Sequence, residues 1–265
     1  MMNHINKQKI IYFPNSQNPR WLVRSDKIGE FWRILPRNGF RGKVKSVFVR
    51  IIFPKLRSLL PYVNSEMLGA HFLYLGVDDG KQTQLSIILK KNFLVIEKFC
   101  ICKNSYVFIS KEAEILKKIS VSRTSNFPQF ISFEQGKLKY YGAIQKVGFT
   151  PKIKNHRKKL IDALAHFYRH FPISMNDEGI LTCMSHGDLN KWNMFIDKNN
   201  KLHIFDFETT REAPLGFDLA TSYVNEFNYT YFLTVLREDF IILASQLDFY
   251  DFQIELQMQK ILEMI

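Results

Sequence analysis

The amino-acid sequence predicts an α+β protein with a β-rich N-terminal lobe and an α-helical C-terminal lobe, preceded by a basic N-terminal extension. Between residues 70 and 101, short apolar runs alternate with polar turns, which is typical of an antiparallel sheet. From residue 155 onward, apolar residues recur with helical spacing. Residues 1–64 carry 13 Lys and Arg against two acids, whereas residues 201–265 carry four against 11, so the two ends differ in character.

Composition excludes several classes of protein. Of the 265 residues 46% are hydrophobic, so a packed core is expected and wholesale disorder is excluded. The three cysteines form no even set and no C-x-x-C pair, which excludes a disulfide scaffold and a zinc ribbon. The sequence contains no run typical of a signal peptide or a membrane span, so a cytoplasmic protein is expected. The net charge of +12 comes without a nucleic-acid-binding motif, so no nucleic acid is expected as a partner.

Residues 1–64 are predicted to form the basic extension. Pro and Gly scattered through residues 1–40 favour extended or irregular backbone. Within residues 44–52 the apolar positions follow the spacing of an amphipathic helix, which Pro54 should end or kink. The basic stretch 43–60 has two interpretations. It contacts an anionic membrane peripherally, or it docks its apolar face on the protein and leaves its basic face in solvent.

Residues 65–147 are predicted to form the β-rich lobe. The runs HFLYLGV, QLSIILK and FLVIEKFCI are separated by short polar segments, which predicts an antiparallel meander. A helix is expected over about residues 110–119, with Ser110 as its N-cap. The run KLKYYGAIQKV then predicts a further strand before Gly148.

Residues 148–265 are predicted to form the helical lobe. Residues 155–170 place Leu160, Leu164 and Phe167 on one helical stripe. The tail from about residue 217 to the C-terminus is predicted to form two or three aromatic-rich helices.

A polar cluster follows from the geometry of a predicted hairpin. The short apolar strands MFI and LHIF flank the Asn-rich turn DKNNK. If residue 196 lies opposite residue 202, Asn193 lies opposite Phe205 and next to Asp206, because directly opposed residues are close in space. Hard oxygen ligands brought together in this way suit Mg²⁺.

Asp188 precedes Asn193 by five residues and would lie on the loop that leads to the same end of the hairpin. Its carboxylate would be free to orient a substrate hydroxyl beside the metal. One base and two metal ligands are the minimum set of groups for phosphoryl transfer, in which catalysis is mainly positioning and neutralisation of charge.

These residues carry a family resemblance. The run HGDLNKWN at residues 186–193, followed by DFE at 206–208, resembles the catalytic and metal-binding motifs of the aminoglycoside phosphotransferase and choline kinase family, which are relatives of the protein kinases. The run GFDLA at 216–220, with Glu226-Phe227 after it, is similar to the choline and ethanolamine kinase branch. The resemblance covers roughly residues 65–230.

The resemblance implies a bilobal protein-kinase-like fold and a phosphotransferase that uses Mg²⁺ and ATP. It implies Asp188 as the catalytic base and Asn193 and Asp206 as the magnesium ligands. It further implies that Asp218 braces the catalytic loop and that His186 packs against this loop.

The predicted N-terminal lobe (residues 65–147) would bind the nucleotide. Lys98 shares one strand face with apolar neighbours, and an inward ammonium needs an anion. Glu112 falls on the buried face of the predicted helix whereas Glu114 does not, so Lys98 and Glu112 are expected to pair. The alternative makes Lys98 a solubility charge on an edge strand and Glu112 a carboxylate favoured by the helix dipole.

Two further nucleotide contacts are expected. Gly76 lies in the loop GVDDGKQ, which would cover the phosphates, although Asp78 and Asp79 depart from the protein-kinase glycine-rich pattern. The segment from Gln145 to Val147 leaves the last predicted strand of this lobe and would contact the adenine.

The phosphate acceptor is expected to be a small amino alcohol such as choline or ethanolamine, an amino sugar, or a cell-envelope saccharide. Aromatic and acidic residues of the tail could hold a cationic head group. Alternatively, these aromatics are core and the acids a solvated face. The alternative to an enzyme is a pseudokinase or a nucleotide-binding scaffold without transfer activity. The intact Asp188, Asn193 and Asp206 argue for the enzyme.

Overall fold

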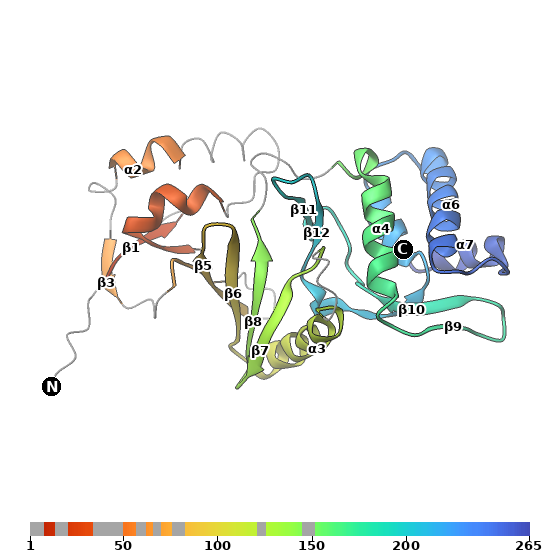
Figure 1. The fold of residues 1–265 in the computed structure, drawn as a ribbon, viewed down its shortest axis with the longest axis horizontal. Helices are drawn as coiled ribbons and strands as arrows, with labels where there is room; N and C mark the ends of the chain where they lie inside the picture. Colours follow the sequence, from red (N-terminus) through yellow and green to blue (C-terminus); the bar gives the residue numbers. More distant parts are fainter. Residues whose placement is uncertain are drawn as a thin grey trace. The chain divides into compact units, whose positions relative to one another are not determined.

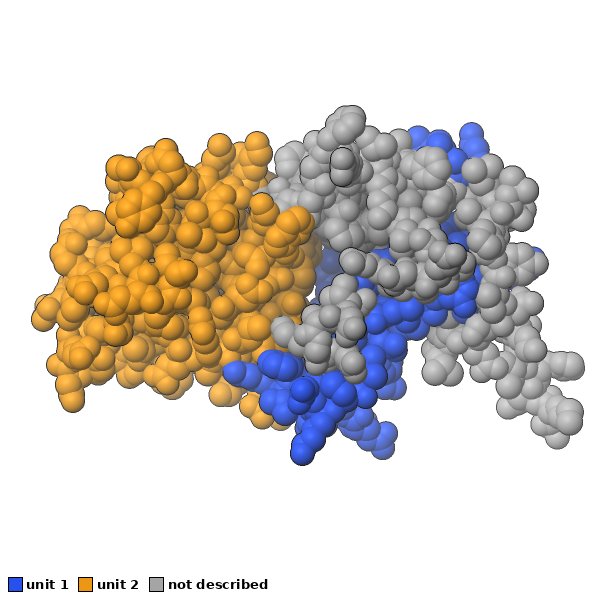
Figure 2. All heavy atoms as spheres, turned by 180° about the vertical axis from the view of Figure 1, so that it is seen from behind, with its two compact units in different colours: residues 1–113, 129–149 blue, residues 114–128, 150–265 orange. Residues whose placement is uncertain are grey.

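The computed structural model describes residues 8–13, 21–33, 50–56, 62–65, 70–75, 83–120, 126–144 and 152–265. The chain forms two compact units (Figure 2). Unit 1 contains residues 1–113 and 129–149, and unit 2 contains residues 114–128 and 150–265. Unit 1 holds a large antiparallel sheet and unit 2 is mainly helical (Figure 1).

The sheet of unit 1 has eight strands in the order β3-β1-β2-β4-β5-β6-β8-β7, and neighbouring strands are antiparallel. The strands are β1 (Gln8–Phe13), β2 (Trp21–Arg24), β3 (Tyr62–Ser65), β4 (Phe72–Tyr74), β5 (Thr83–Leu89), β6 (Phe93–Cys100), β7 (Gln129–Glu134) and β8 (Lys137–Ala143). The predicted meander is therefore present as β4, β5 and β6. Strand β6 lies inside the sheet, because β5 pairs with one edge and β8 with the other.

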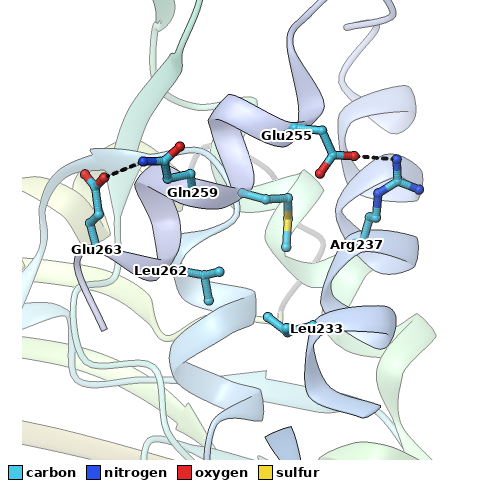
Figure 3. A pocket seen from close by; sticks show the side chains of 7 residues that line it. Leu233, Arg237, Glu255, Gln259, Leu262 and Glu263 are labelled. Carbon is cyan, nitrogen blue, oxygen red and sulfur yellow. Dashed lines mark hydrogen bonds and ion pairs between the residues drawn. The ribbon is translucent and has the colours of Figure 1, made fainter. Parts of the chain in front are cut away.

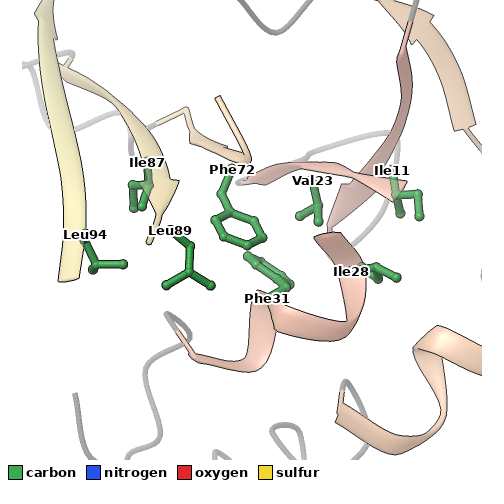
Figure 4. Close-up of a cluster of buried hydrophobic side chains, with 8 residues drawn as sticks. All are labelled: Ile11, Val23, Ile28, Phe31, Phe72, Ile87, Leu89 and Leu94. Carbon is green, nitrogen blue, oxygen red and sulfur yellow. The ribbon is translucent and has the colours of Figure 1, made fainter. Parts of the chain in front are cut away.

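The structure differs from the predicted extension over residues 1–64. Strands β1, β2 and β3 come from this segment and belong to the same sheet as the later strands. Helix η1 (Ser25–Arg33), a 3₁₀ helix, covers part of this sheet. Figure 4 shows one buried cluster in which Ile11, Val23 and Phe31 contact side chains of β4, β5 and β6. The described residues of this segment therefore form regular elements of the sheet instead of a separate extension.

The helix after β6 begins earlier than predicted. Helix α3 spans Lys103–Ile119, so Ser110 lies inside it and donates a hydrogen bond to the carbonyl of Val107 (3.0 Å) instead of capping it. Ser105 stabilises the true start, because its buried hydroxyl accepts hydrogen bonds from the N–H groups of Ile101 and Cys102 (both 3.0 Å). Serine side chains bond to nearby backbone in both settings, so a serine alone does not locate a helix start.

The predicted amphipathic helix lies mostly outside the described residues. Arg50 and Ile51 are helical, Ile52 is a turn, and helix α2 (Phe53–Leu56) follows. The break comes just before Pro54, as the missing N–H of proline dictates. Ile51 and Ile52 are 51% and 37% exposed.

Unit 2 is built on four α-helices and two small sheets in its described residues. The helices are α4 (Arg157–Tyr168), α5 (Phe217–Tyr223), α6 (Tyr229–Gln246) and α7 (Ile254–Leu262), with 3₁₀ turns η2 (Ile153–Asn155) and η3 (Phe207–Thr209). The strands are β9 (Ile173–Met175), β10 (Leu181–Ser185), β11 (Met194–Ile196), β12 (Leu202–Ile204) and β13 (Arg211–Pro214). Strand β10 is central in one sheet, and β11 pairs with β12 in the other.

The core of unit 2 lies between helix α4 and the elements around it. Leu160, Leu164 and Phe167 are all buried, as the predicted stripe requires. Gln257 fixes helix α7, because its fully buried amide accepts the Leu181 N–H (2.8 Å) and donates to the carbonyls of Leu181 and Leu215. Across the described segments, every helix is too short or too polar to cross a lipid bilayer.

Candidate active site

The hairpin β11–β12 has the register that the sequence predicts. Ile196 pairs with Leu202, and Met194 pairs with Ile204. The N–H of Phe205 donates to the carbonyl of Asn193 (3.1 Å), which extends the pairing by one position. Asn193 and Phe205 are therefore neighbours, and Asp206 follows at the same end of the hairpin.

The turn of this hairpin is stabilised by Asp197. Its carboxylate accepts hydrogen bonds from the N–H groups of Asn199 (2.8 Å) and Lys201 (2.9 Å) and contacts the His203 ring (3.1 Å). Aspartate side chains favour such turns because they bond to backbone a few residues on. The turn fixes the register, and the register fixes which side chains reach the far end.

The Asp188 loop is tied directly to Asn193. The Asn193 Nδ2 donates to the Asp188 carbonyl (2.7 Å) and to its Oδ2 (3.2 Å). Asp188 is exposed, whereas Asn193 is 9% exposed. The arrangement leaves the Asn193 amide oxygen as the atom of that side chain suited to a cation. The predicted base and one predicted metal ligand are therefore adjacent.

Asp206 occupies an unusual backbone conformation. Its φ is +71°, in the left-handed region, immediately before η3. Carboxylate oxygens of Asp206 and Glu208 lie within 4.8 Å of each other. Together with an amide oxygen, two carboxylates form a hard oxygen donor set that fits Mg²⁺. The sequence reasoning gave Glu208 no role, although its place two residues after Asp206 in one short turn could have suggested one.

Asp218 holds the backbone of the loop in place. Its carboxylate is fully buried in α5 and accepts four hydrogen bonds. The donors are the Tyr168 hydroxyl (2.8 Å), the Ser185 hydroxyl (2.7 Å), the His186 N–H (2.9 Å) and the Gly187 N–H (3.3 Å). Asp218 thus occupies the position that the resemblance implied for a bracing residue.

His186 and Gly187 complete the start of the loop. The His186 Nε2 lies 2.9 Å from the Phe205 carbonyl, so this nitrogen carries the proton, and its ring packs on Phe207. Gly187 has φ +85°, and a Cβ there would collide with the carbonyl oxygen of Thr209. Glycine is therefore required by both conformation and space.

In unit 1, the predicted ion pair is present. The Lys98 Nζ lies 2.6 Å from the Glu112 Oε2, and the two side chains are 6% and 0% exposed. Because β6 is an internal strand and α3 begins at Lys103, neither part of the alternative interpretation holds. A buried ion pair of this kind contributes little net stability.

The remaining nucleotide contacts cannot be placed in the same way. Gly76, Gln145 and Val147 lie outside the described residues, as does the acidic pair Asp78 and Asp79.

Two of the tail acids have structural partners. Asp239 is 2% exposed and accepts two hydrogen bonds from Arg157 (2.8 Å each) and one from the Tyr223 hydroxyl (2.6 Å). Burial and the neighbouring carboxylate raise the pKa of Tyr223, so this hydroxyl keeps its proton. Glu238 also contacts Arg157 (3.1 Å). Asp239 therefore joins α4, α5 and α6, and it is not a surface group for a cationic ligand.

Helices α6 and α7 border a pocket of about 510 Å³ (Figure 3). Its lining residues are Leu233, Arg237, Glu255, Met258, Gln259, Leu262 and Glu263. An ion pair between Arg237 and Glu255 (2.7 Å) lies at this pocket. The lining contains none of the predicted site residues, so this pocket is separate from the candidate active site.

The chain resembles one protein family in sequence and a solved structure in fold. Residues 146–247 match the model of the APH phosphotransferase enzyme family. No curated protein matches the chain in sequence. A solved macrolide 2′-phosphotransferase type I has a TM-score of 0.50 at 12% identity, over 72% of this chain and 83% of its own.

Two other solved structures match less closely in shape. The choline kinase LicA from Streptococcus pneumoniae has a TM-score of 0.42 at 16% identity, over 81% of this chain and 97% of its own. An aminoglycoside phosphotransferase from Streptomyces rimosus has a TM-score of 0.41 at 9% identity, over 68% and 91%. The family match over residues 146–247 and the fold shared with the macrolide enzyme confirm the predicted resemblance to this phosphotransferase family and the predicted kinase-like α+β fold.

Proposed function

We propose that this protein is a phosphotransferase that moves the γ-phosphate of ATP to a hydroxyl group of a small molecule, with Mg²⁺ as its metal. The observation that carries the proposal is the arrangement of Asp188, Asn193 and Asp206 at one end of the β11–β12 hairpin, where hydrogen bonds hold Asp188 to Asn193. This arrangement supplies a proton acceptor beside a hard oxygen donor set.

Asp188 acts as the base in the proposed reaction. Its exposed carboxylate accepts the proton of the acceptor hydroxyl as the hydroxyl oxygen forms a bond to the γ-phosphorus. The bond from the γ-phosphorus to the bridging oxygen breaks, and ADP leaves with the electron pair. The proton then passes from Asp188 to solvent. Bound Mg²⁺, held by Asn193 and Asp206 with Glu208 nearby, would neutralise phosphate charge.

Lys98 supplies positive charge for the nucleotide phosphates. Glu112 fixes its ammonium from the buried side at 2.6 Å, so the side chain has one orientation before the nucleotide arrives. Such preorganisation reduces the cost of ordering a flexible lysine when the ligand binds.

A peripheral membrane contact is proposed for the segment around residue 51. Ile51 and Ile52 are exposed, and Arg50 and Lys55 beside them are exposed as well. Exposed apolar side chains flanked by basic ones are what an anionic membrane surface binds. This contact would bring the enzyme close to an acceptor at the inner face of the membrane.

The decisive experiment measures ADP release from MgATP with a panel of amino alcohols, aminoglycosides and envelope sugars. The Asp188→Asn variant should lose transfer at least about a hundredfold, the scale of general base catalysis, and keep its nucleotide affinity within a few-fold. The exposed Tyr250→Ala variant is the matched control. Nucleotide binding without turnover on any acceptor would favour the scaffold alternative. A fully active Asp188→Asn variant would contradict the assignment of the base.

A further inference from the structure

The catalytic loop contains three residues to which the proposed reaction gives no task, Asn190, Lys191 and Trp192. The Asn190 Nδ2 donates to the Asp188 Oδ1 (2.8 Å), and the Asn190 Oδ1 accepts the Trp192 N–H (2.8 Å). Only one orientation of the amide satisfies both bonds. The Asn193 N–H donates to the Asn190 carbonyl (3.1 Å), which closes the turn. A single side chain therefore fixes Trp192 relative to the base.

Trp192 presents an aromatic surface at this position. Its side chain is 57% exposed, so its ring is accessible to a ligand. The Lys191 Nζ lies 5.5 Å from the centroid of the Trp192 ring, so a cation already occupies one side of the indole. An aromatic face and an ammonium group thus lie in the same short turn as the proposed base Asp188, to which Asn190 connects them.

We propose that Trp192 and Lys191 form the acceptor-binding surface and that the acceptor is an uncharged or anionic saccharide, not a cationic amino alcohol or amino sugar. The inference rests on the proposed function and adds the substrate class. The C–H groups of a sugar ring carry partial positive charge and stack on the negative face of an indole. Lys191 donates hydrogen bonds to sugar hydroxyls or pairs with an acidic group.

The same two residues disfavour a cationic acceptor. A quaternary ammonium would have to share the Trp192 ring with Lys191, and like charges repel at such distances. Two of the tail acids do not offset this repulsion. Asp239 and Glu238 are already bound by Arg157, and Asp239 is buried. The charge of Lys191 and the aromatic surface of Trp192 therefore both favour an uncharged or anionic saccharide.

Binding can be tested without turnover. The chain has three tryptophans, so ¹⁵N-labelled protein gives three indole N–H signals, and the Trp192→Phe variant identifies the signal of Trp192 by its loss. Titration with N-acetylglucosamine, glucuronate and a panel of neutral and acidic disaccharides should shift this signal for at least one sugar. Choline chloride at the same concentration should leave it in place. A shift with choline of equal or higher affinity, or no shift with any saccharide, overturns the proposal.

Kinetics then test the specificity. For the best saccharide, Trp192→Ala should raise the acceptor KM about tenfold, the scale of an aromatic stacking contact, and leave the KM for MgATP unchanged. Trp192→Phe keeps an aromatic ring, so its acceptor KM should stay close to that of the wild type. Lys191→Glu should shift the preference between saccharide and choline about fivefold toward choline, whereas the charge reversal Lys158→Glu on the exposed face of α4 should not. An unchanged preference in Lys191→Glu rejects the proposal. Absence of all transfer beside an intact binding signal would instead reject the proposed reaction.

Discussion

Asp206 and Asp188 lie at the same hairpin end but have different tasks, and their variants should fail in different ways. Removing the Asp206 carboxylate takes away a metal ligand, so Asp206→Ala should weaken MgATP binding. We expect a loss of tenfold or more, the scale of a metal-site change. Calorimetric titration of the nucleotide with and without Mg²⁺ measures it. The same Mg²⁺-dependent affinity in wild type and variant would remove Asp206 from the metal site.

Lys98 is expected to matter for catalysis more than for folding. Lys98→Met removes the ammonium and keeps most of the side-chain length, so kcat/KM should fall strongly while the fold is retained. The variant leaves Glu112 without the ammonium at 2.6 Å, and the double variant Lys98→Met/Glu112→Gln removes that buried charge as well. Both proteins should show native circular dichroism. Normal kinetics in either variant would show that the pair is structural.

The residues of the site differ in how well the sequence predicts them. Asn193 and Asp206 are predictable because the register of a short hairpin brings them together, and Asp188 because it lies on the loop five residues before Asn193. The role of Asn190 is not, because it depends on a side-chain orientation that satisfies two hydrogen bonds at once. Glu208 belongs to the DFE run. Its carboxylate lies near that of Asp206 in a turn in which Asp206 has a left-handed backbone conformation, and this conformation is not evident from the sequence.

At the level of elements, the segment around residue 51 gives a test of membrane contact. Each Lys or Arg near an anionic surface contributes about 1 kcal/mol, and screening reduces this attraction as salt rises. The protein should therefore float with anionic liposomes at low salt and be released at high salt. Ile51→Ser/Ile52→Ser should float less, and Phe93→Ser, which changes another exposed apolar residue, should not. Failure of the wild type to float at low salt would end this interpretation.

Local pattern predicted elements well where neighbours in sequence are partners in space. The β11–β12 hairpin is such a case, since a five-residue turn sets its register. Helix α3 shows the opposite. Its first turn is held by Ser105 bonding back to residues 101 and 102, whereas the sequence offered Ser110 as an equally suitable cap. Ser105, which is at the start of the helix, is fully buried, whereas Ser110 is not. Burial depends on the rest of unit 1, so the sequence alone does not show which serine lies at the helix start.

For the whole molecule, the main departure from prediction is the first 64 residues. The family resemblance covers roughly residues 65–230, so it contained no information on what precedes that range. Strand β2 pairs with β4 across about 50 residues of sequence, from Val23 to Phe72. Pairing over such a separation leaves no local signature, because each strand alone shows only a short apolar run.

The buried cluster of unit 1 allows a test of whether the first 64 residues share a core with the later strands. Phe31 is fully buried and its ring lies 5.5 Å from that of Phe72. Phe31→Ala should reduce the free energy of unfolding of unit 1 by about 3–5 kcal/mol, the usual cost of removing a buried aromatic ring. Urea denaturation followed by tryptophan fluorescence, to which Trp21 packed on Phe31 contributes, reports this loss. The exposed Tyr250→Ala variant should change little, and an equally small effect of Phe31→Ala would contradict the shared core.

Strand β2 also protects the edge of β4, and this has a practical consequence for anyone preparing the protein. A shortened version cut at residue 65 to match the kinase-like region would lose β1, β2 and β3 and leave one edge of β4 unpaired, the other edge still being paired with β5. Open strand edges beside exposed apolar side chains template sheet-to-sheet association between molecules. Such a preparation would be expected to elute as aggregates, and its inactivity would reflect self-association and not a missing catalytic group.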